Sequence, residues 1–144
     1  MAKNEQETRK LAKLLAGEVI KKPLKIKTAL VIGLEGELGS GKTTFIKAFS
    51  RKLGIRKRLT SPTFVILRRY TIKDRQFTNL YHIDCYRLNK SKELLDLGFK
   101  EIINNSRNIV LIEWAEKIKS ILPRNTLWIK FEIRSNKERK IVIK

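Results

Sequence analysis

One stretch of the chain constrains its fold more than any other. Residues 36–43 read Gly-Glu-Leu-Gly-Ser-Gly-Lys-Thr, which fits the phosphate-loop pattern of Gly, any four residues and Gly-Lys-Ser/Thr. Its glycines let successive backbone N–H groups turn toward phosphate oxygens, through angles that side chains disfavour. Lys42 is a flexible cation able to reach the phosphates, and the Thr43 hydroxyl is a hard oxygen suited to Mg²⁺. The pattern predicts a binding site for the phosphates of a nucleotide.

The residues on either side of this phosphate loop agree with that prediction. Before it, residues 29–34 are apolar, and we expect a buried strand over 28–35. After it, we expect a helix over 42–53, with an apolar face and Gly54 as its stop signal. A strand, a glycine-rich loop and a helix in this order predict an α/β P-loop NTPase fold.

Length and composition favour one domain over residues 1–144, large enough for a hydrophobic core. No apolar run approaches the roughly 20 residues that span a membrane, and residues 1–7 lack the apolar core of a signal peptide. The only cysteine, Cys85, lies in an apolar stretch, which predicts a buried thiol in a reducing compartment. We therefore expect a cytoplasmic protein with no membrane partner.

The charge of the chain is strongly positive. Lys and Arg number 33 against 14 Asp and Glu, and the formal net charge is +19. Such a field favours polyanions, so we expect contact with nucleic acid. The cations are spread over most of the chain and its richness in Lys, Ile and Asn is also what codon bias produces, so specific readout by this chain alone is not expected.

The remaining pattern predicts helices and strands on both sides of the phosphate-loop region. Gly98 should divide residues 91–104 into short helices, and Asn89 or Ser91 is the candidate cap of the first. The other expected elements are a helix over 4–22, a β-hairpin over 64–88 with strands at 65–71 and 77–88, a buried strand over 108–112, a helix over 115–121, and strands at 127–134 and 139–143.

A phosphate loop also needs a carboxylate near the metal ion and a group that positions water. Glu113 ends a short, fully apolar strand and precedes a helix, which places it at the carboxyl edge of a parallel sheet, where ligands bind. Asp84 lies in the middle of a longer alternating strand and could orient the attacking water or a metal-bound one. The competing interpretation of each is a surface carboxylate among many lysines.

Other polar and aromatic residues near these acids have weaker signals. Ser61 and Thr63, in a loop after the phosphate-loop helix, could offer a hydroxyl to Mg²⁺ or to the γ-phosphate, and an ordinary turn explains them equally well. His82, two residues before Asp84 on the same strand face, is assigned a structural role. Trp114 is assigned to core packing, and the alternatives are that it packs over the site or faces a partner.

Several blocks of this sequence occur in the same order and spacing in one family. They are the phosphate loop, Ser61-Pro62-Thr63-Phe64, Tyr81-His82-Ile83-Asp84-Cys85-Tyr86-Arg87-Leu88, Leu97-Gly98-Phe99 and Leu111-Ile112-Glu113-Trp114-Ala115-Glu116-Lys117. In this combination the chain resembles the TsaE family, also called YjeE. Residues 124–144 take least from the resemblance, because the family varies there.

The resemblance implies a small bacterial ATPase that is needed for threonylcarbamoyladenosine (t6A) in tRNAs that read codons beginning with A. It implies TsaD and TsaB as protein partners, a separate enzyme, TsaC, that makes the activated intermediate, and ATP hydrolysis that drives or resets the TsaD–TsaB complex. Contact with tRNA would then occur through that complex or directly. The implied fold is a P-loop α/β domain with a mixed sheet, flanking helices and β-hairpin additions.

Carried over by position, the resemblance assigns roles to individual residues. Thr43 and Glu113 would hold Mg²⁺, and Lys42 and Glu113 would carry hydrolysis. Asp84 would serve hydrolysis or contact with the tRNA-modifying partner, and Trp114 would lie near the site. ATP would be bound by Thr8, near the base, and by Gly36, Glu37, Leu38, Gly39, Ser40, Gly41, Lys42, Thr43 and Thr44. Two departures are mild, since Ser40 stands where the family often has alanine and Cys85 where it often has a larger apolar residue.

Three other functions share parts of this pattern. A small nucleotide or metabolite kinase would use the same loop, but should add an arginine-rich lid. A small GTPase would need Asn-Lys-x-Asp, and residues 89–92 read Asn-Lys-Ser-Lys. A basic nucleic-acid-binding module with a vestigial nucleotide site would not need the complete Gly-Lys-Thr together with Glu113.

Overall fold

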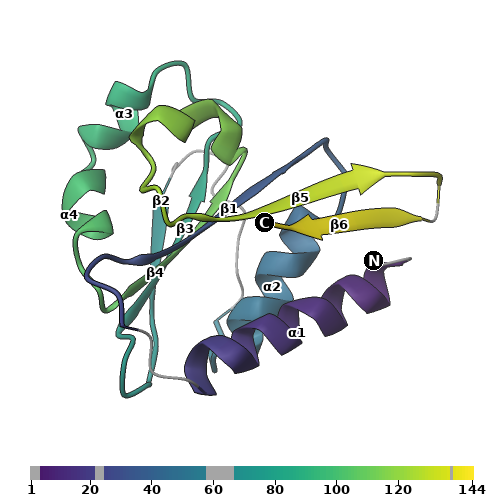
Figure 1. The fold of residues 1–144 in the computed structure, drawn as a ribbon, viewed down its shortest axis with the longest axis horizontal. Helices are drawn as coiled ribbons and strands as arrows, with labels where there is room; N and C mark the ends of the chain where they lie inside the picture. The colour runs from purple at the N-terminus through teal and green to yellow at the C-terminus, as the bar shows by residue number, and fades with distance from the viewer. Residues whose placement is uncertain (1–3, 22–24, 58–66, 137) are drawn as a thin grey trace.

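A computed structural model describes residues 4–21, 25–57, 67–136 and 138–144. The predicted roles of Ser61 and Thr63, and the start of the strand expected at 65–71, lie outside these residues. The described part of the chain forms a six-stranded sheet with helices on both faces (Figure 1).

Helices and strands are interspersed along the chain. In order they are α1 (Glu5–Lys21), β1 (Leu30–Gly36), α2 (Lys42–Lys52), β2 (Leu67–Thr71), β3 (Asn79–Asp84), α3 (Ser91–Leu95), α4 (Phe99–Ile103), β4 (Asn108–Glu113), the 3₁₀ helix η1 (Ala115–Ile121), β5 (Leu127–Ile133) and β6 (Arg139–Ile143).

The strand order is β2-β3-β4-β1-β5-β6. The four central strands run parallel, whereas β2 and β6 pair antiparallel with β3 and β5 and form the two edges. The predicted mixed α/β sheet with β-hairpin additions is thereby confirmed. Because parallel strands end at the same side of a sheet, the carboxyl ends of β1, β3 and β4 meet where a ligand of an open α/β sheet binds.

Two hydrophobic cores cover the two faces of the sheet. On one face α1 and α2 pack together and against the sheet, around Phe45, Phe49 and Phe131. On the other face α3, α4 and η1 pack around Ile83, Phe99 and Ile112 (Figure 1). All residues of β4 are buried, as expected for a central strand with both faces covered.

Two local predictions are corrected by the structure. β3 ends at Asp84 and does not continue to Leu88, although Cys85 and Leu88 remain buried. The N-cap of α3 is Lys90, and no side chain caps this helix, so neither Asn89 nor Ser91 has the predicted role. The predicted break at Gly98 is confirmed, because its positive φ of 85° separates α3 from α4.

Candidate functional site

The phosphate loop joins β1 to α2 through backbone angles that glycine adopts readily. Gly36, Gly39 and Gly41 have φ values of 147°, 76° and 108°. A Cβ on Gly36 would lie 2.5 Å from the carbonyl oxygen of Phe131, so any larger residue there would displace β5. The predicted order of strand, glycine-rich loop and helix is confirmed.

This loop opens into a cavity of about 800 Å³ at the carboxyl edge of the sheet. Most of the residues predicted to bind nucleotide or to act on it line this cavity. The lining residues are Asn4, Glu5, Thr8, Leu38, Gly39, Ser40, Gly41, Lys42, Thr43, Thr44, Asp84, Tyr86, Arg87, Glu113, Trp114, Asn136 and Arg139. Gly36 and Glu37 precede the part of the loop that faces it.

Lys42 is buried at the centre of this site. Its ammonium group donates a hydrogen bond to the carbonyl oxygen of Gly36, and Nζ lies 3.6 Å from the centroid of the Trp114 ring. Burial lowers the pKa of Lys42, and the nearby carboxylates of Glu113 and Glu116 oppose that shift. The ammonium group of Lys42 therefore lies in the cavity with few protein partners and is available to bind a phosphate.

The position of Trp114 corrects the assignment to core packing. The residue follows β4 directly and has a positive φ of 57°, which is unusual for a residue with a side chain. Its ring is half-buried, lines the cavity, and packs on Lys42 and on Tyr86. Trp114 thus forms a wall of the candidate site.

Glu113, the last residue of β4, joins the phosphate loop to β3. Its Oε1 accepts a hydrogen bond from the Thr43 hydroxyl at 3.1 Å, and its Oε2 lies 2.8 Å from Nε2 of His82. A carboxylate accepts, so Nε2 of His82 carries the proton that it donates. Both side chains are almost fully buried, so this contact fixes the direction in which Glu113 points. The structural role assigned to His82 is therefore to orient an acid of the site.

Asp84 lies beside Glu113, because the two residues are register partners at the ends of the parallel strands β3 and β4. The prediction that Asp84 sits within a longer strand is wrong, and its true place at the strand end brings it into the cavity. One oxygen accepts a hydrogen bond from the Tyr86 backbone N–H at 3.0 Å. Burial, aided by the charge of Glu113, raises the pKa of Asp84.

This raised pKa predicts that Asp84 opposes folding at neutral pH. Between the unfolded and the folded pKa the folded state holds more protons, so the free energy of unfolding falls as pH rises through that range. We expect Asp84→Asn to increase the free energy of unfolding at pH 7, with the gain disappearing below about pH 4, where the unfolded carboxyl is protonated. Urea denaturation at both pH values measures this.

The matched control for this experiment is Asp96→Asn. Asp96 is exposed at the end of α3, and its neutralisation should leave the free energy of unfolding nearly unchanged at either pH. If Asp84→Asn lowered the free energy of unfolding at pH 7, this would contradict the inference that burial disfavours the charged form of Asp84.

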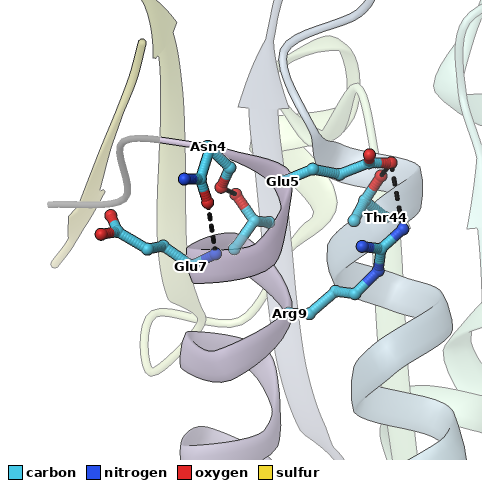
Figure 2. A network of polar contacts seen from close by, with 6 residues as sticks. Asn4, Glu5, Glu7, Arg9 and Thr44 are labelled. Atoms are coloured by element: carbon cyan, nitrogen blue, oxygen red, sulfur yellow. Dashed lines mark hydrogen bonds and ion pairs between the residues drawn. The ribbon is translucent and has the colours of Figure 1, made fainter. Parts of the chain in front are cut away.

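The start of α1 lines the cavity with Asn4, Glu5 and Thr8, and Figure 2 shows the polar contacts of this segment. The Thr8 hydroxyl donates to the carbonyl oxygen of Asn4 at 3.2 Å, and a Cβ on Gly41 would lie 3.7 Å from the Thr8 methyl group. Glu5 accepts a hydrogen bond from Thr44 at 3.3 Å. The helix that carries Thr8 is therefore packed against the phosphate loop, and a contact of Thr8 with the base stays a prediction.

Sequence reasoning missed the contribution of the β5–β6 hairpin. Arg139 of β6 reaches the phosphate loop and donates from Nε to the carbonyl oxygen of Gly39 at 3.3 Å. Asn136 from the same hairpin lines the cavity as well. No local pattern marks either residue, because they meet the loop only through the pairing of β5 with β1.

The oxygen atoms in the site suit Mg²⁺ bound together with phosphates. The hydroxyl of Thr43 and the carboxylates of Glu113 and Asp84 are hard donors on one side of the cavity. Among the described residues no group of three or more His, Cys, Asp and Glu side chains could hold a metal ion alone. That is the usual arrangement for Mg²⁺, which takes one or two protein ligands and completes its shell with phosphates and water.

A glycine-rich loop between a central parallel strand and a helix, with an acid at the end of the neighbouring strand, defines a P-loop nucleotide-binding fold. Comparison with known proteins identifies the family. The model of the family described as "Threonylcarbamoyl adenosine biosynthesis protein TsaE" matches residues 2–141. The chain belongs to the TsaE family, which takes part in t6A biosynthesis, and the resemblance drawn from the sequence is confirmed.

Individual relatives agree with this assignment. The tRNA threonylcarbamoyladenosine biosynthesis protein TsaE of Rickettsia felis is 39% identical over 94% of this chain and 73% of its own length. The protein of that name from Bacillus subtilis is 39% identical over 96% and 79%. The crystal structure of Bacillus subtilis YdiB superposes with a TM-score of 0.70 at 34% identity, covering 97% of this chain and 79% of that one.

The described residues include no helix long and apolar enough to cross a membrane.

The thiol of Cys85 is fully buried, as predicted, and burial raises its pKa to about 12. Cys85 therefore has no reactive thiolate at neutral pH and contributes to the core beside the site.

Proposed function

We propose that this protein binds ATP with Mg²⁺ at the phosphate loop and hydrolyses it in the service of t6A formation in tRNA. The observation that carries the proposal is the meeting of Lys42, Thr43, Asp84 and Glu113 in one cavity at the carboxyl edge of the sheet. Each has the chemistry that phosphoryl transfer to water requires.

In this proposal the protein binds and orients the nucleotide. Its two acids have different roles, since Glu113 is a ligand of the metal ion and Asp84 accepts a proton. Backbone N–H groups of the loop and the Lys42 ammonium would hold the phosphates. Thr43 and Glu113 would hold Mg²⁺, which would supply positive charge for the reaction. Asp84 accepts a hydrogen bond from the attacking water. Its raised pKa makes it a better proton acceptor than an ordinary aspartate, as long as it is ionised.

The partner side of the proposal comes from family membership. We infer that ATP binding and hydrolysis act on a TsaD–TsaB complex, which carries out the transfer to tRNA, and that the change of nucleotide state drives or resets that complex. The cavity favours a switch, because its walls come from separate segments: the start of α1, the loop after β4 and the β5–β6 hairpin. A nucleotide that contacts all three would favour the arrangement of these segments that it binds best.

Isothermal titration tests the nucleotide assignment directly. We expect ATP to bind in the presence of Mg²⁺ and to bind at least about tenfold more weakly when EDTA removes the metal ion, since the phosphates then lose their counter-charge. Tight GTP binding with no ATP binding would contradict the proposal.

The partner assignment has a separate test. ATP turnover is measured with the protein alone and with purified TsaD and TsaB, and a pull-down from cells asks whether TsaD is recovered with the tagged chain. We expect faster turnover in the presence of both partners. A basal rate that the partners leave unchanged, with no TsaD in the pull-down, would overturn the partner assignment and leave the nucleotide assignment standing.

A further inference from the structure

A second groove, distinct from the nucleotide cavity, lies between α1 and α2 and has a volume of about 660 Å³. Its lining is dominated by cations from three segments, two on α1, two on α2 and two just after α2. These are Arg9, Lys13, Lys47, Arg51, Arg56 and Lys57. All six side chains are exposed to solvent.

Almost none of this charge is neutralised within the molecule. The one acid that lines the groove, Glu5, already accepts from Thr44 and forms an ion pair with Arg9 at 3.2 Å (Figure 2). None of the other five cations forms an ion pair with a carboxylate of the described residues. A concave surface with this many unpaired cations attracts anions strongly.

The basic surface continues beyond the first groove. A smaller groove of about 370 Å³ shares Arg56 and Lys57 with it and adds Arg69 of β2. β2 is an edge strand, so Arg69 takes the basic surface to the edge of the sheet. The cations therefore form a track from α1 across α2 to one edge of the sheet, longer than a single phosphate group or nucleotide would need.

We propose that this track binds the sugar–phosphate backbone of RNA. On each helix the two cations are spaced i and i+4, so they lie on one face with their Cβ atoms about 5–6 Å apart. Each pair can therefore contact neighbouring phosphates of one strand. The described residues that line the first groove include no aromatic side chain on which a base could stack, so we expect contact with the backbone that carries no base sequence. A regular polyanion matches the length of the track better than the scattered carboxylates of a protein surface.

The track also adjoins the nucleotide cavity. Glu5, Thr43 and Thr44 line both spaces, so RNA in the groove would lie beside the phosphate end of the nucleotide site. Because RNA phosphates also have the chemistry to enter the phosphate loop itself, the experiment has to separate the two locations.

Fluorescence anisotropy with a fluorescein-labelled short RNA hairpin and the full chain tests the proposal. The variant Lys47→Glu/Arg51→Glu should bind the hairpin about tenfold more weakly or worse at low salt. Its plot of log affinity against log salt should be shallower by about one unit for each phosphate that the variant no longer binds. The matched control, Lys92→Glu/Lys100→Glu, makes the same change of charge on α3 and α4, across the sheet, and should retain near-normal affinity.

Further arms identify where and what the protein binds. Saturating ADP with Mg²⁺ should leave the hairpin bound, whereas complete release would place the RNA in the phosphate loop and overturn the proposal. Equal weakening by both double variants would show diffuse attraction and overturn it too. A polyglutamate peptide that binds as tightly as the hairpin and depends on Lys47 and Arg51 would assign the track to an acidic protein. If charge reversal lowers the thermal stability, Lys47→Gln/Arg51→Gln gives the same comparison without new repulsion.

Discussion

Replacing Lys42 with alanine is expected to abolish ATP binding while leaving the fold intact. The ammonium group is buried in the cavity, and its protein partners are a backbone carbonyl and an aromatic ring rather than a carboxylate. It is therefore available to phosphate, and hydrogen bonds between charged groups are roughly twice as strong as neutral ones. We expect ATP affinity to fall by about 100-fold or more.

Stability should respond to this change far less than binding. The lowered pKa of Lys42 shows that burial already disfavours its charge. Removing the charge therefore offsets part of the stabilisation that the hydrogen bond to Gly36 and the packing on Trp114 provide. Titration calorimetry gives the affinity and circular dichroism the melting temperature. Lys47→Ala, an exposed lysine on the same helix, is the control and should keep ATP affinity. Unchanged ATP affinity in Lys42→Ala would remove the phosphate loop from the proposed function.

Replacing Glu113 with glutamine is expected to uncouple ATP binding from Mg²⁺. The amide keeps the size of the side chain and can still accept from Thr43 or from His82, so the local packing is retained. It has no charge for the metal ion. We expect the gain in ATP affinity on adding Mg²⁺ to shrink by about tenfold or more, and ATP hydrolysis to fall by about 100-fold.

Glu116→Gln is the matched control for Glu113. Glu116 lies three residues further on, and burial raises the pKa of its carboxyl, but it lies outside the cavity lining. We expect the control to keep its response to Mg²⁺ in calorimetry and in an assay of phosphate release. A full magnesium response in Glu113→Gln would show that a different residue holds the metal ion.

Sequence predicts this fold best where a motif and the residues on either side of it indicate the same structure. β1, the phosphate loop and α2 all fall where expected, because glycine angles, an apolar run and a helical stripe act over a few adjacent residues. β4 is predicted for a similar reason. A short apolar run that must bury both faces has few alternatives to a central strand.

The end of β3 could not be predicted in the same way. Apolar residues continue past Asp84 to Cys85 and Leu88, and both are buried, so the alternating pattern gives no sign of a strand end. The structure uses them in a turn, in which the Leu88 N–H donates to the Cys85 carbonyl at 3.1 Å. The strand stops where its neighbour β4 stops, and that limit is set by pairing between distant segments.

Contacts between segments far apart in the sequence also explain the other differences between prediction and structure at the site. The contact between His82 and Glu113 spans two strands, although the shared strand face of His82 and Asp84 is a usable signal. Glu113 and Ala115 on either side of Trp114 give no local signal for its position, whereas the structure shows its positive φ and the contact of its ring with Lys42. Arg139 reaches the loop from the far end of the chain and has no local signal at all.

The two antiparallel edge strands have a consequence for how this protein behaves in a crowded solution. An open sheet edge exposes backbone N–H and C=O groups that can recruit a strand from another molecule, and that is a route to aggregation. Here β2 carries Arg68 and Arg69, and β6 begins with Arg139 and Lys140. Paired cations on both open edges repel a second copy of the same edge. The positive charge that suits this chain to a polyanion thus also keeps its sheet from extending into a neighbour.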